Sequence, residues 1–191
     1  MKVLIDTSSL LSLVRYYLPF DGKRKMHDFF KDKMSAKEIV LIDRVFEECR
    51  YTAGGAILSS VSCLGDSAFL KDCKLPFSTK HIVAPDTRQF LHHVNNTFVN
   101  APVRRKLSDD QFETEKLGFL AGADMGLVMM CMEYRKQNKG ETVLLVTEET
   151  EGSNDRKVFK KLPAICQVLN LETITLPTLL QRYPDIDVLY T

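Results

Sequence analysis

The sequence has no excess of charge of either sign and no apolar run long enough to cross a membrane. Lys and Arg number 26 against 25 Asp and Glu, which gives a formal net charge of +1 over 191 residues. The net charge therefore neither favours nor excludes binding of a polyanion such as a nucleic acid. Such a partner would need a local basic patch. The apolar stretch LAGADMGLVMMCM is interrupted by Asp124. We therefore expect a buried helix there and no contact with a membrane.

The cysteines lack the spacing of a metal site. Five are present, an odd number without a CxxC pair or a Cys/His cluster, at Cys49, Cys63, Cys73, Cys131 and Cys166. This pattern argues against zinc. Free thiols, together with the lack of a recognisable signal peptide, predict a reducing, cytoplasmic location.

Internal repeats and low-complexity linkers are also lacking, so we expect a single domain over residues 1–191. Hydrophobic residues make up 45% of the chain, which is ordinary for a globular protein. The length suffices for a sizeable core. Residues 51–84 are rich in Gly, Ser and Cys and follow no firm period, so we expect an irregular insertion there.

Short apolar runs separated by helical patterns organise the rest of the chain. Strands are predicted at 3–5, 38–42, 142–147 and 173–176, although 38–42 could also lead into a helix. Helices are predicted over 7–17, 23–34, from Asp43, from Pro85, over 108–140 in two parts joined near 118–122, over 158–169 and from Pro177. Apolar strands alternating with helices predict an α/β fold whose central parallel sheet is covered on both faces.

Acidic residues follow two of these strands directly. Asp6 comes after the strand at 3–5, and Glu148 and Glu149 follow the strand at 142–147. Sites in parallel sheets lie at the carboxyl ends of the strands. A buried carboxylate is costly without a partner, so Asp6 either caps the following helix or holds something charged.

Two further acids adjoin apolar helices, namely Glu48 in VFEECR and Asp124 in AGADMGLVMMC. Carboxylates brought together repel one another, and a divalent cation removes the conflict. A ligand set of oxygen atoms alone suits Mg²⁺ or Mn²⁺. Phosphodiester hydrolysis uses the effects that such an ion offers to a water, a phosphate and a leaving oxygen.

Four motifs in this order resemble the PIN-domain family, namely IDTSSLL, RVFEEC, GADMGLVMMC and LLVTEE. The resemblance covers nearly the whole chain outside residues 51–84. It implies a three-layer α/β/α PIN-like fold and a Mg²⁺- or Mn²⁺-dependent endoribonuclease, often a VapC-type toxin with an antitoxin partner. It also makes a homodimer plausible.

Carried over to this sequence, the resemblance implies that Asp6, Glu48, Asp124 and Glu149 are the catalytic metal ligands. Ser8 and Thr147 are implied as hydroxyls that orient carboxylates or waters. Two choices stay open. Glu148 and Asp155 compete with Glu149 as the fourth acid, and Glu47 competes with Glu48. The family usually has aspartate at the fourth position.

Basic residues that could contact RNA are Arg15, Arg156 and Lys157, with the runs KRK (23–25) and RRK (104–106). Runs of charged residues more often form a solvated surface than a binding site. No catalytic spacing is found among the histidines His27, His81, His92 and His93. Two other functions remain open: a non-catalytic PIN-like module that binds RNA or protein, and a structure-specific DNA nuclease.

Overall fold

Four parallel strands form the centre of the computed structural model, which describes residues 1–138, 140–150, 156–183 and 186. The strand order is β2-β1-β3-β4, and all neighbouring pairs are parallel. The strands span Lys2–Ile5 (β1), Ile39–Val40 (β2), Val143–Val146 (β3) and Glu172–Ile174 (β4). The predicted α/β class with a parallel sheet is confirmed.

The two central strands are built from apolar residues because helices pack over them. All four residues of β3 are buried, as are Val3, Leu4 and Ile5 of β1. The register pairs Leu4 with Leu145 and Ile5 with Val146. Both strands therefore end at the same level, so Asp6 and Thr147 follow them at one edge of the sheet.

Helices connect the strands, and most lie where the sequence predicts them. Before β3 come α1 (Thr7–Ser12), the π-helix η1 (Leu13–Tyr17), the 3₁₀ turn η2 (Leu18–Phe20), α2 (Lys25–Ser35), α3 (Asp43–Tyr51), α7 (Thr87–His92), the π-helix η4 (His93–Thr97), α8 (Ala101–Arg104), α9 (Asp109–Ala121) and α10 (Ala123–Gln137). After β3 come α11 (Leu162–Val168) and α12 (Leu176–Gln181). The predicted break between α9 and α10 falls at Gly122, whose backbone is extended.

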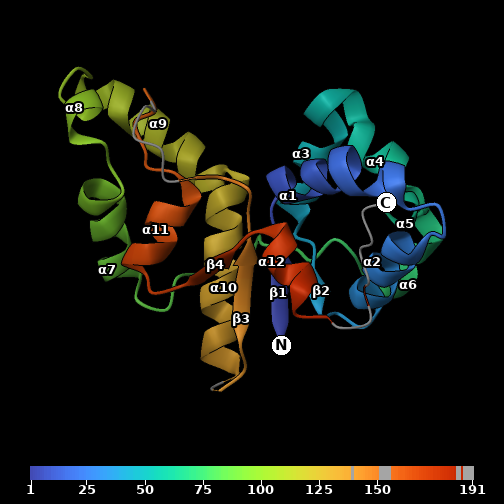
Figure 1. Cartoon of the computed structure of the whole chain (residues 1–191). Helices are drawn as coiled ribbons and strands as arrows, with labels where there is room; N and C mark the ends of the chain where they lie inside the picture. The colour runs from blue at the N-terminus through green and yellow to red at the C-terminus, as the bar shows by residue number, and fades with distance from the viewer. Residues whose placement is uncertain (139, 151–155, 184–185, 187–191) are drawn as a thin grey trace.

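Figure 1 shows α1, α2 and α3 above or to the right of β1, and α7 to α11 to its left. Helix α10 packs on β1 and β3, α11 packs on β4, and α2 packs on β2. Because β1 rises from the N-terminus at the bottom of Figure 1, the carboxyl ends of the parallel strands lie at the top of the sheet.

The prediction of an irregular insertion over residues 51–84 is wrong for most of that stretch. This stretch contains η3 (Thr52–Gly55), α4 (Ala56–Ser60), α5 (Ser62–Gly65) and α6 (Ser67–Cys73). Each helix is too short to repeat an apolar period, which hides it from pattern analysis. Tertiary packing stabilises them instead: Ile57 and Leu64 are buried, and α4 packs against α3.

The helix predicted over 158–169 begins late, at Leu162. Phe159 instead forms an antiparallel bridge with Val99, and Pro163 in the first turn favours a helix start at this point. The last strand and helix are likewise shifted, because β4 ends at Ile174 and Leu176 already belongs to α12.

In the described part of the chain, no single helix is long and apolar enough to span a membrane. Helices α9 and α10 meet that criterion of length and composition only as a pair bent by 56°.

Candidate functional site

Asp6 lies at the junction of β1 and α1, where it is only 5% exposed. Its Oδ1 accepts a hydrogen bond of 2.6 Å from the Thr7 backbone N–H, so Asp6 is the N-cap of α1. Its Oδ2 accepts hydrogen bonds from the hydroxyls of Ser8 (2.6 Å) and Thr147 (3.0 Å). One oxygen therefore caps the helix, while the other lies between two hydroxyls that could give way to a cation.

Ser8 and Thr147 also connect this junction to the segment after β3. Ser8 Oγ accepts a hydrogen bond of 3.0 Å from the backbone N–H of Glu148. Thr147 Oγ1 accepts one of 3.1 Å from the N–H of Glu149. The two hydroxyls therefore orient Asp6 and also hold the backbone that carries the competing fourth acids.

Glu48 reaches the same junction from α3, since the Thr7 hydroxyl donates a hydrogen bond of 2.7 Å to its Oε2. The residue as a whole is exposed rather than partly buried. Glu47 instead forms an ion pair with Arg50 (3.3 Å) and accepts a hydrogen bond from the Tyr51 hydroxyl (3.3 Å). Of the two neighbouring glutamates, Glu48 is thus the one in contact with the Asp6 segment.

The two glutamates after β3 bind the N-termini of two different helices. Glu148 Oε1 accepts a hydrogen bond of 2.6 Å from the Leu176 N–H, at the start of α12. Glu149 Oε2 accepts one of 3.2 Å from the Leu162 N–H, at the start of α11. These capping roles are absent from the sequence interpretation. The only local sign is that both helices open with Leu-Pro, which marks a helix start without naming the remote cap. Asp155, the third competing acid, lies outside the described residues.

Asp124 lies half-buried in the first turn of α10. Burial, together with the negative charges of Asp6, Glu149 and Glu48, raises the pKa of this carboxyl from 3.8 to about 7, while Lys157 opposes the shift. Three acids that are far from Asp124 in the sequence therefore lie close enough to act on its carboxyl. Each of the four comes from a different element or junction.

The thiols beside this site are buried. Burial, together with the charges of Glu48 and Asp6, raises the pKa of Cys49 to about 12. Burial, together with the charge of Asp124, raises the pKa of Cys166 to about 12. All five cysteines, which lie within the described residues, are free and buried in the core.

A pocket of about 550 Å³ opens beside Asp124 and Glu149. Its lining also includes the basic residues Arg156, Lys157, Lys160 and Lys161. The rings of Phe119 and Phe159 stack along it with centroids 4.0 Å apart. Arg156 and Lys157 thus line the same pocket as Asp124 and Glu149, whereas Arg15 is exposed on η1 and is not among the residues that line it.

The donor atoms of the site fit a hard divalent cation in type and in charge, since all are carboxylate and hydroxyl oxygens. A finished ligand shell is not formed. Within the ranges that the structure describes, no group of three or more His, Cys, Asp or Glu side chains is arranged to hold an ion. Asp6, Glu48 and Glu149 instead accept hydrogen bonds from the protein. Binding of a metal would therefore require rotations of these side chains.

Arg44 links two of the acidic elements, and sequence reasoning did not identify it. Its Nη1 donates hydrogen bonds to the backbone oxygens of Leu120 (2.7 Å) and Gly122 (3.1 Å), where α9 ends and α10 begins. Glu48 follows Arg44 by one turn of α3, and Asp124 follows Gly122 by two residues. Arg44 therefore holds the helix that carries Glu48 against the helix that carries Asp124.

No family model, no curated protein and no solved structure matches this chain. The residues of the site are therefore the basis for assigning a function.

Proposed function

We propose that this protein is a PIN-like, Mg²⁺- or Mn²⁺-dependent nuclease that hydrolyses the phosphodiester bonds of RNA. The observation that carries the proposal is the convergence of Asp6, Glu48, Asp124 and Glu149, which reach one edge of a parallel sheet from separate elements. Their mutual repulsion leaves a concentration of negative charge that a divalent cation would neutralise.

Each residue has a distinct part in this proposal. Asp6, Glu48, Asp124 and Glu149 would hold the ion, which when bound supplies charge stabilisation at a phosphate and a more acidic water. Ser8 and Thr147 orient Asp6 through its Oδ2. Arg156 and Lys157 line the same pocket and attract the phosphate group.

The proposal extends to architecture and setting. A three-layer PIN-like arrangement is supported by the packing of α10, α11 and α2 on the strands. The free thiols support a reducing, cytoplasmic location. A toxin role, with an antitoxin that places Arg or Lys among the four acids, rests on the motif resemblance, as does a homodimer. A complex that leaves these acids exposed would exclude this mode of inhibition.

Cleavage of matched RNA and DNA oligonucleotides, with Mg²⁺, Mn²⁺ or EDTA, tests the proposal directly. We expect RNA cleavage that requires the ion and disappears in Asp6→Asn. Cleavage of DNA alone would assign the same chemistry to a DNA nuclease. Cleavage that persists in EDTA or in Asp6→Asn would contradict the proposal.

A non-catalytic PIN-like binding module is the second candidate, because hydrogen bonds within the protein already engage three of the acids. Thermal denaturation with Mn²⁺ separates the two functions. If the site binds the ion, a hundredfold excess over Kd stabilises the fold by about 2.7 kcal/mol. For a chain of this size, this corresponds to a rise in Tm of about 5–10 °C. No rise with either ion, together with no cleavage, would favour the binding module.

The fourth acid can be assigned with the pair Glu148→Gln and Glu149→Gln. Glu148 contacts the start of α12, so its neutralisation should cost about 0.3–1 kcal/mol of stability and leave the Mn²⁺-induced rise in Tm unchanged. Glu149 lines the pocket with Asp124, so Glu149→Gln should abolish that rise. Loss of the Mn²⁺ response in Glu148→Gln alone would reverse the assignment.

A further inference from the structure

We propose that a single strand of nucleic acid binds along a basic wall formed by two segments that are distant in the sequence. This basic wall consists of Arg105, Lys106, Arg156, Lys157 and Lys160. The inference deepens the proposed nuclease function and rests on it for the identity of the polymer. It assigns the strand to one of the two basic runs in the sequence and excludes the other.

Backbone pairing brings the two segments together. The N–H of Asn100 donates to the Val158 oxygen, and the N–H of Lys160 donates to the Phe98 oxygen, both at 2.8 Å. The Asn100 side chain adds a hydrogen bond of 2.8 Å to the oxygen of Lys157. Helix α8 begins directly after Asn100. The basic residues at its end therefore lie on the same side of the molecule as residues 156–161.

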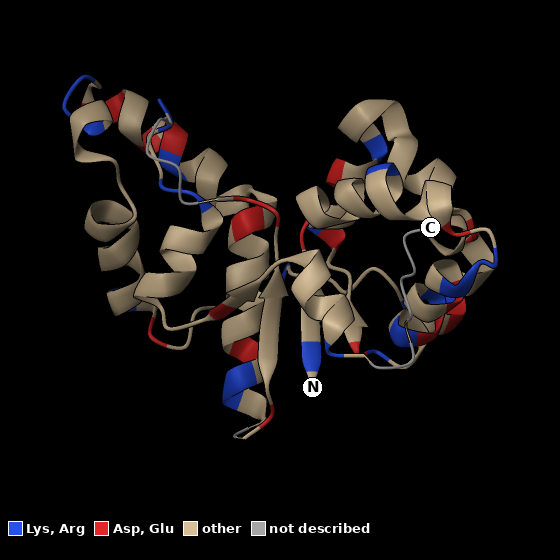
Figure 2. Ribbon diagram, viewed as in Figure 1, with Lys and Arg blue, Asp and Glu red and all other residues tan. Residues whose placement is uncertain are grey.

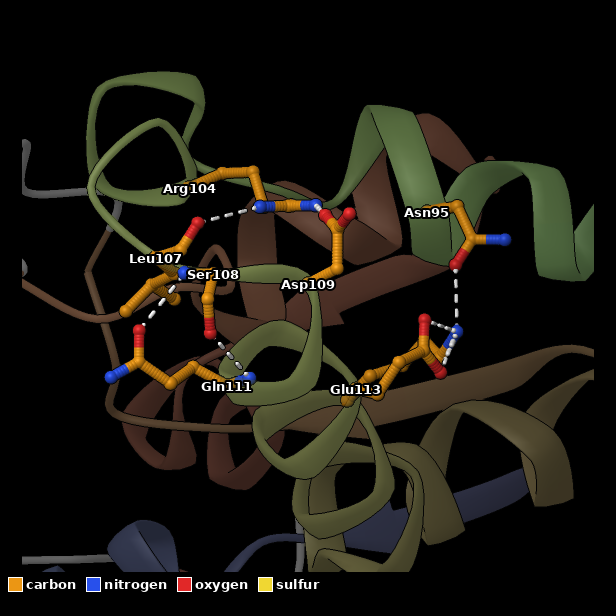
Figure 3. A network of polar contacts seen from close by, with 8 residues as sticks. Asn95, Arg104, Leu107, Ser108, Asp109, Gln111 and Glu113 are labelled. Atoms are coloured by element: carbon orange, nitrogen blue, oxygen red, sulfur yellow. Dashed lines mark hydrogen bonds and ion pairs between the residues drawn. The ribbon is translucent and has the colours of Figure 1, made fainter.

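The charges on this side are unequally compensated. Arg104 is bound to Asp109 (2.6 Å) and to the Leu107 oxygen (3.1 Å), as Figure 3 shows. Lys116 pairs with Glu113 at 2.6 Å. Arg104 and Lys116 are therefore each paired with an acid of α9. The exposed side chains of Arg105 and Lys106 follow the α8 helix, and Figure 2 shows Lys and Arg around the outer end of α9.

The basic wall leads to the acidic site. Lys157 and Lys160 line the pocket that contains Asp124 and Glu149, with Glu115 as a further acid on its wall. Lys157 also acts electrostatically on Asp124. A volume of about 550 Å³ is in the range of pockets that enclose a small ligand. The inferred ligand is a single strand because unpaired nucleotides can leave the stack and enter a pocket, which paired ones in a duplex cannot.

The other basic run, Lys23 to Lys25, leads into α2, which Figure 1 shows to the right of β1, whereas α8 lies to its left. Arg24 there reaches Ser62 Oγ at 3.3 Å, which directs it towards α5. The side chains of Lys23 and Lys25 are exposed. They therefore provide a matched control with the same residue type and the same change in charge.

Fluorescence anisotropy with a labelled single-stranded RNA, in EDTA, tests the inference without cleavage or metal. The double variant Lys157→Gln/Lys160→Gln should bind at least tenfold more weakly. Its salt slope should fall by about 1.4, because each phosphate contact to a single strand contributes about 0.7. Lys23→Gln/Lys25→Gln should bind like the wild type. Lys157→Arg/Lys160→Arg should retain binding, which distinguishes lost charge from a folding defect.

Equal weakening by both double variants, or none by the first, would overturn the inference. So would a failure of the wild type to bind, or duplex RNA that binds as tightly as the single strand. A chain that binds through the basic wall but never cleaves would keep this inference and overturn the nuclease function alone.

Discussion

Asp124→Asn is expected to abolish metal-dependent cleavage and, in EDTA, to make the protein more stable at neutral and alkaline pH. The loss of a ligand should lower activity at least 100-fold, because even the outer partners of metal ligands contribute about 10–100-fold. The gain in stability follows from the site itself. The asparagine of this variant carries no charge, so the repulsion of this partly buried side chain by Asp6, Glu149 and Glu48 would be lost.

The pH dependence of this effect has a definite sign. Burial and the neighbouring acids raise the pKa of Asp124 in the folded protein from 3.8 to about 7. Between these two values the folded state holds a proton that the unfolded state has released. Stability therefore falls as the pH rises from about 4 to 7 and is constant above that. The full penalty is as much as about 4 kcal/mol, at 1.36 kcal/mol for each pKa unit.

Urea denaturation in EDTA between pH 4 and 8 checks this prediction. The wild type should lose stability across the window, and Asp124→Asn should not show this loss. Asp32→Asn, an exposed change on α2, is the control and should follow the wild type. Adding Mn²⁺ at pH 8 should restore stability to the wild type but not to Asp124→Asn. Identical pH profiles for wild type and Asp124→Asn would contradict the electrostatic account.

Arg44→Met is expected to destabilise the fold and to weaken metal binding together. The variant removes a charged donor from the oxygens of Leu120 and Gly122. Hydrogen bonds from charged groups contribute about 1.5–3 kcal/mol, so we expect a loss of about 2–3 kcal/mol. Because the same contacts hold α3 against the start of α10, the Kd for Mn²⁺ should rise about tenfold.

Two comparisons separate this positioning role from general destabilisation. Met34→Ala, on the buried face of α2, should cost about 2–5 kcal/mol but leave the Kd for Mn²⁺ unchanged. Arg44→Lys should recover part of both losses, since an ammonium group keeps the charge without the guanidinium geometry. If Met34→Ala weakened Mn²⁺ binding as much as Arg44→Met, Arg44 would have no specific positioning role.

Gly126 shows how closely Arg44 packs between α3 and α10. A Cβ added there would lie 2.9 Å from Arg44 Cδ and 2.9 Å from Ile42 Cδ1. A glycine inside a helix costs about 0.5–1 kcal/mol relative to alanine. Here its lack of a side chain makes room for the Arg44 stem between α3 and α10.

Local sequence patterns were sufficient to predict many of the strands and helices. The apolar runs at β1 and β3 predict buried parallel strands because residues of that kind are stable only between layers of helices. Ser108, Asp109 and Asp110 are all candidate caps by residue type, and the structure shows Ser108 as the N-cap of α9, in a capping box with Gln111. The same local logic failed for residues 51–84, because helices of four to seven residues depend on packing and not on a repeat.

The sequence by itself determined the α/β class with a parallel sheet, and it singled out Asp6, Glu48, Asp124 and Glu149 as the candidate acids. Both depend on neighbours within a few positions, such as a strand followed by an acid. Only the tertiary structure decided which glutamate faces the pocket and which residue joins α3 to α10. Those choices depend on hydrogen bonds across 28 residues, from Leu176 to Glu148, and across 76, from Arg44 to Leu120. Such contacts form only when the sheet has brought distant segments together, so no local pattern encodes them.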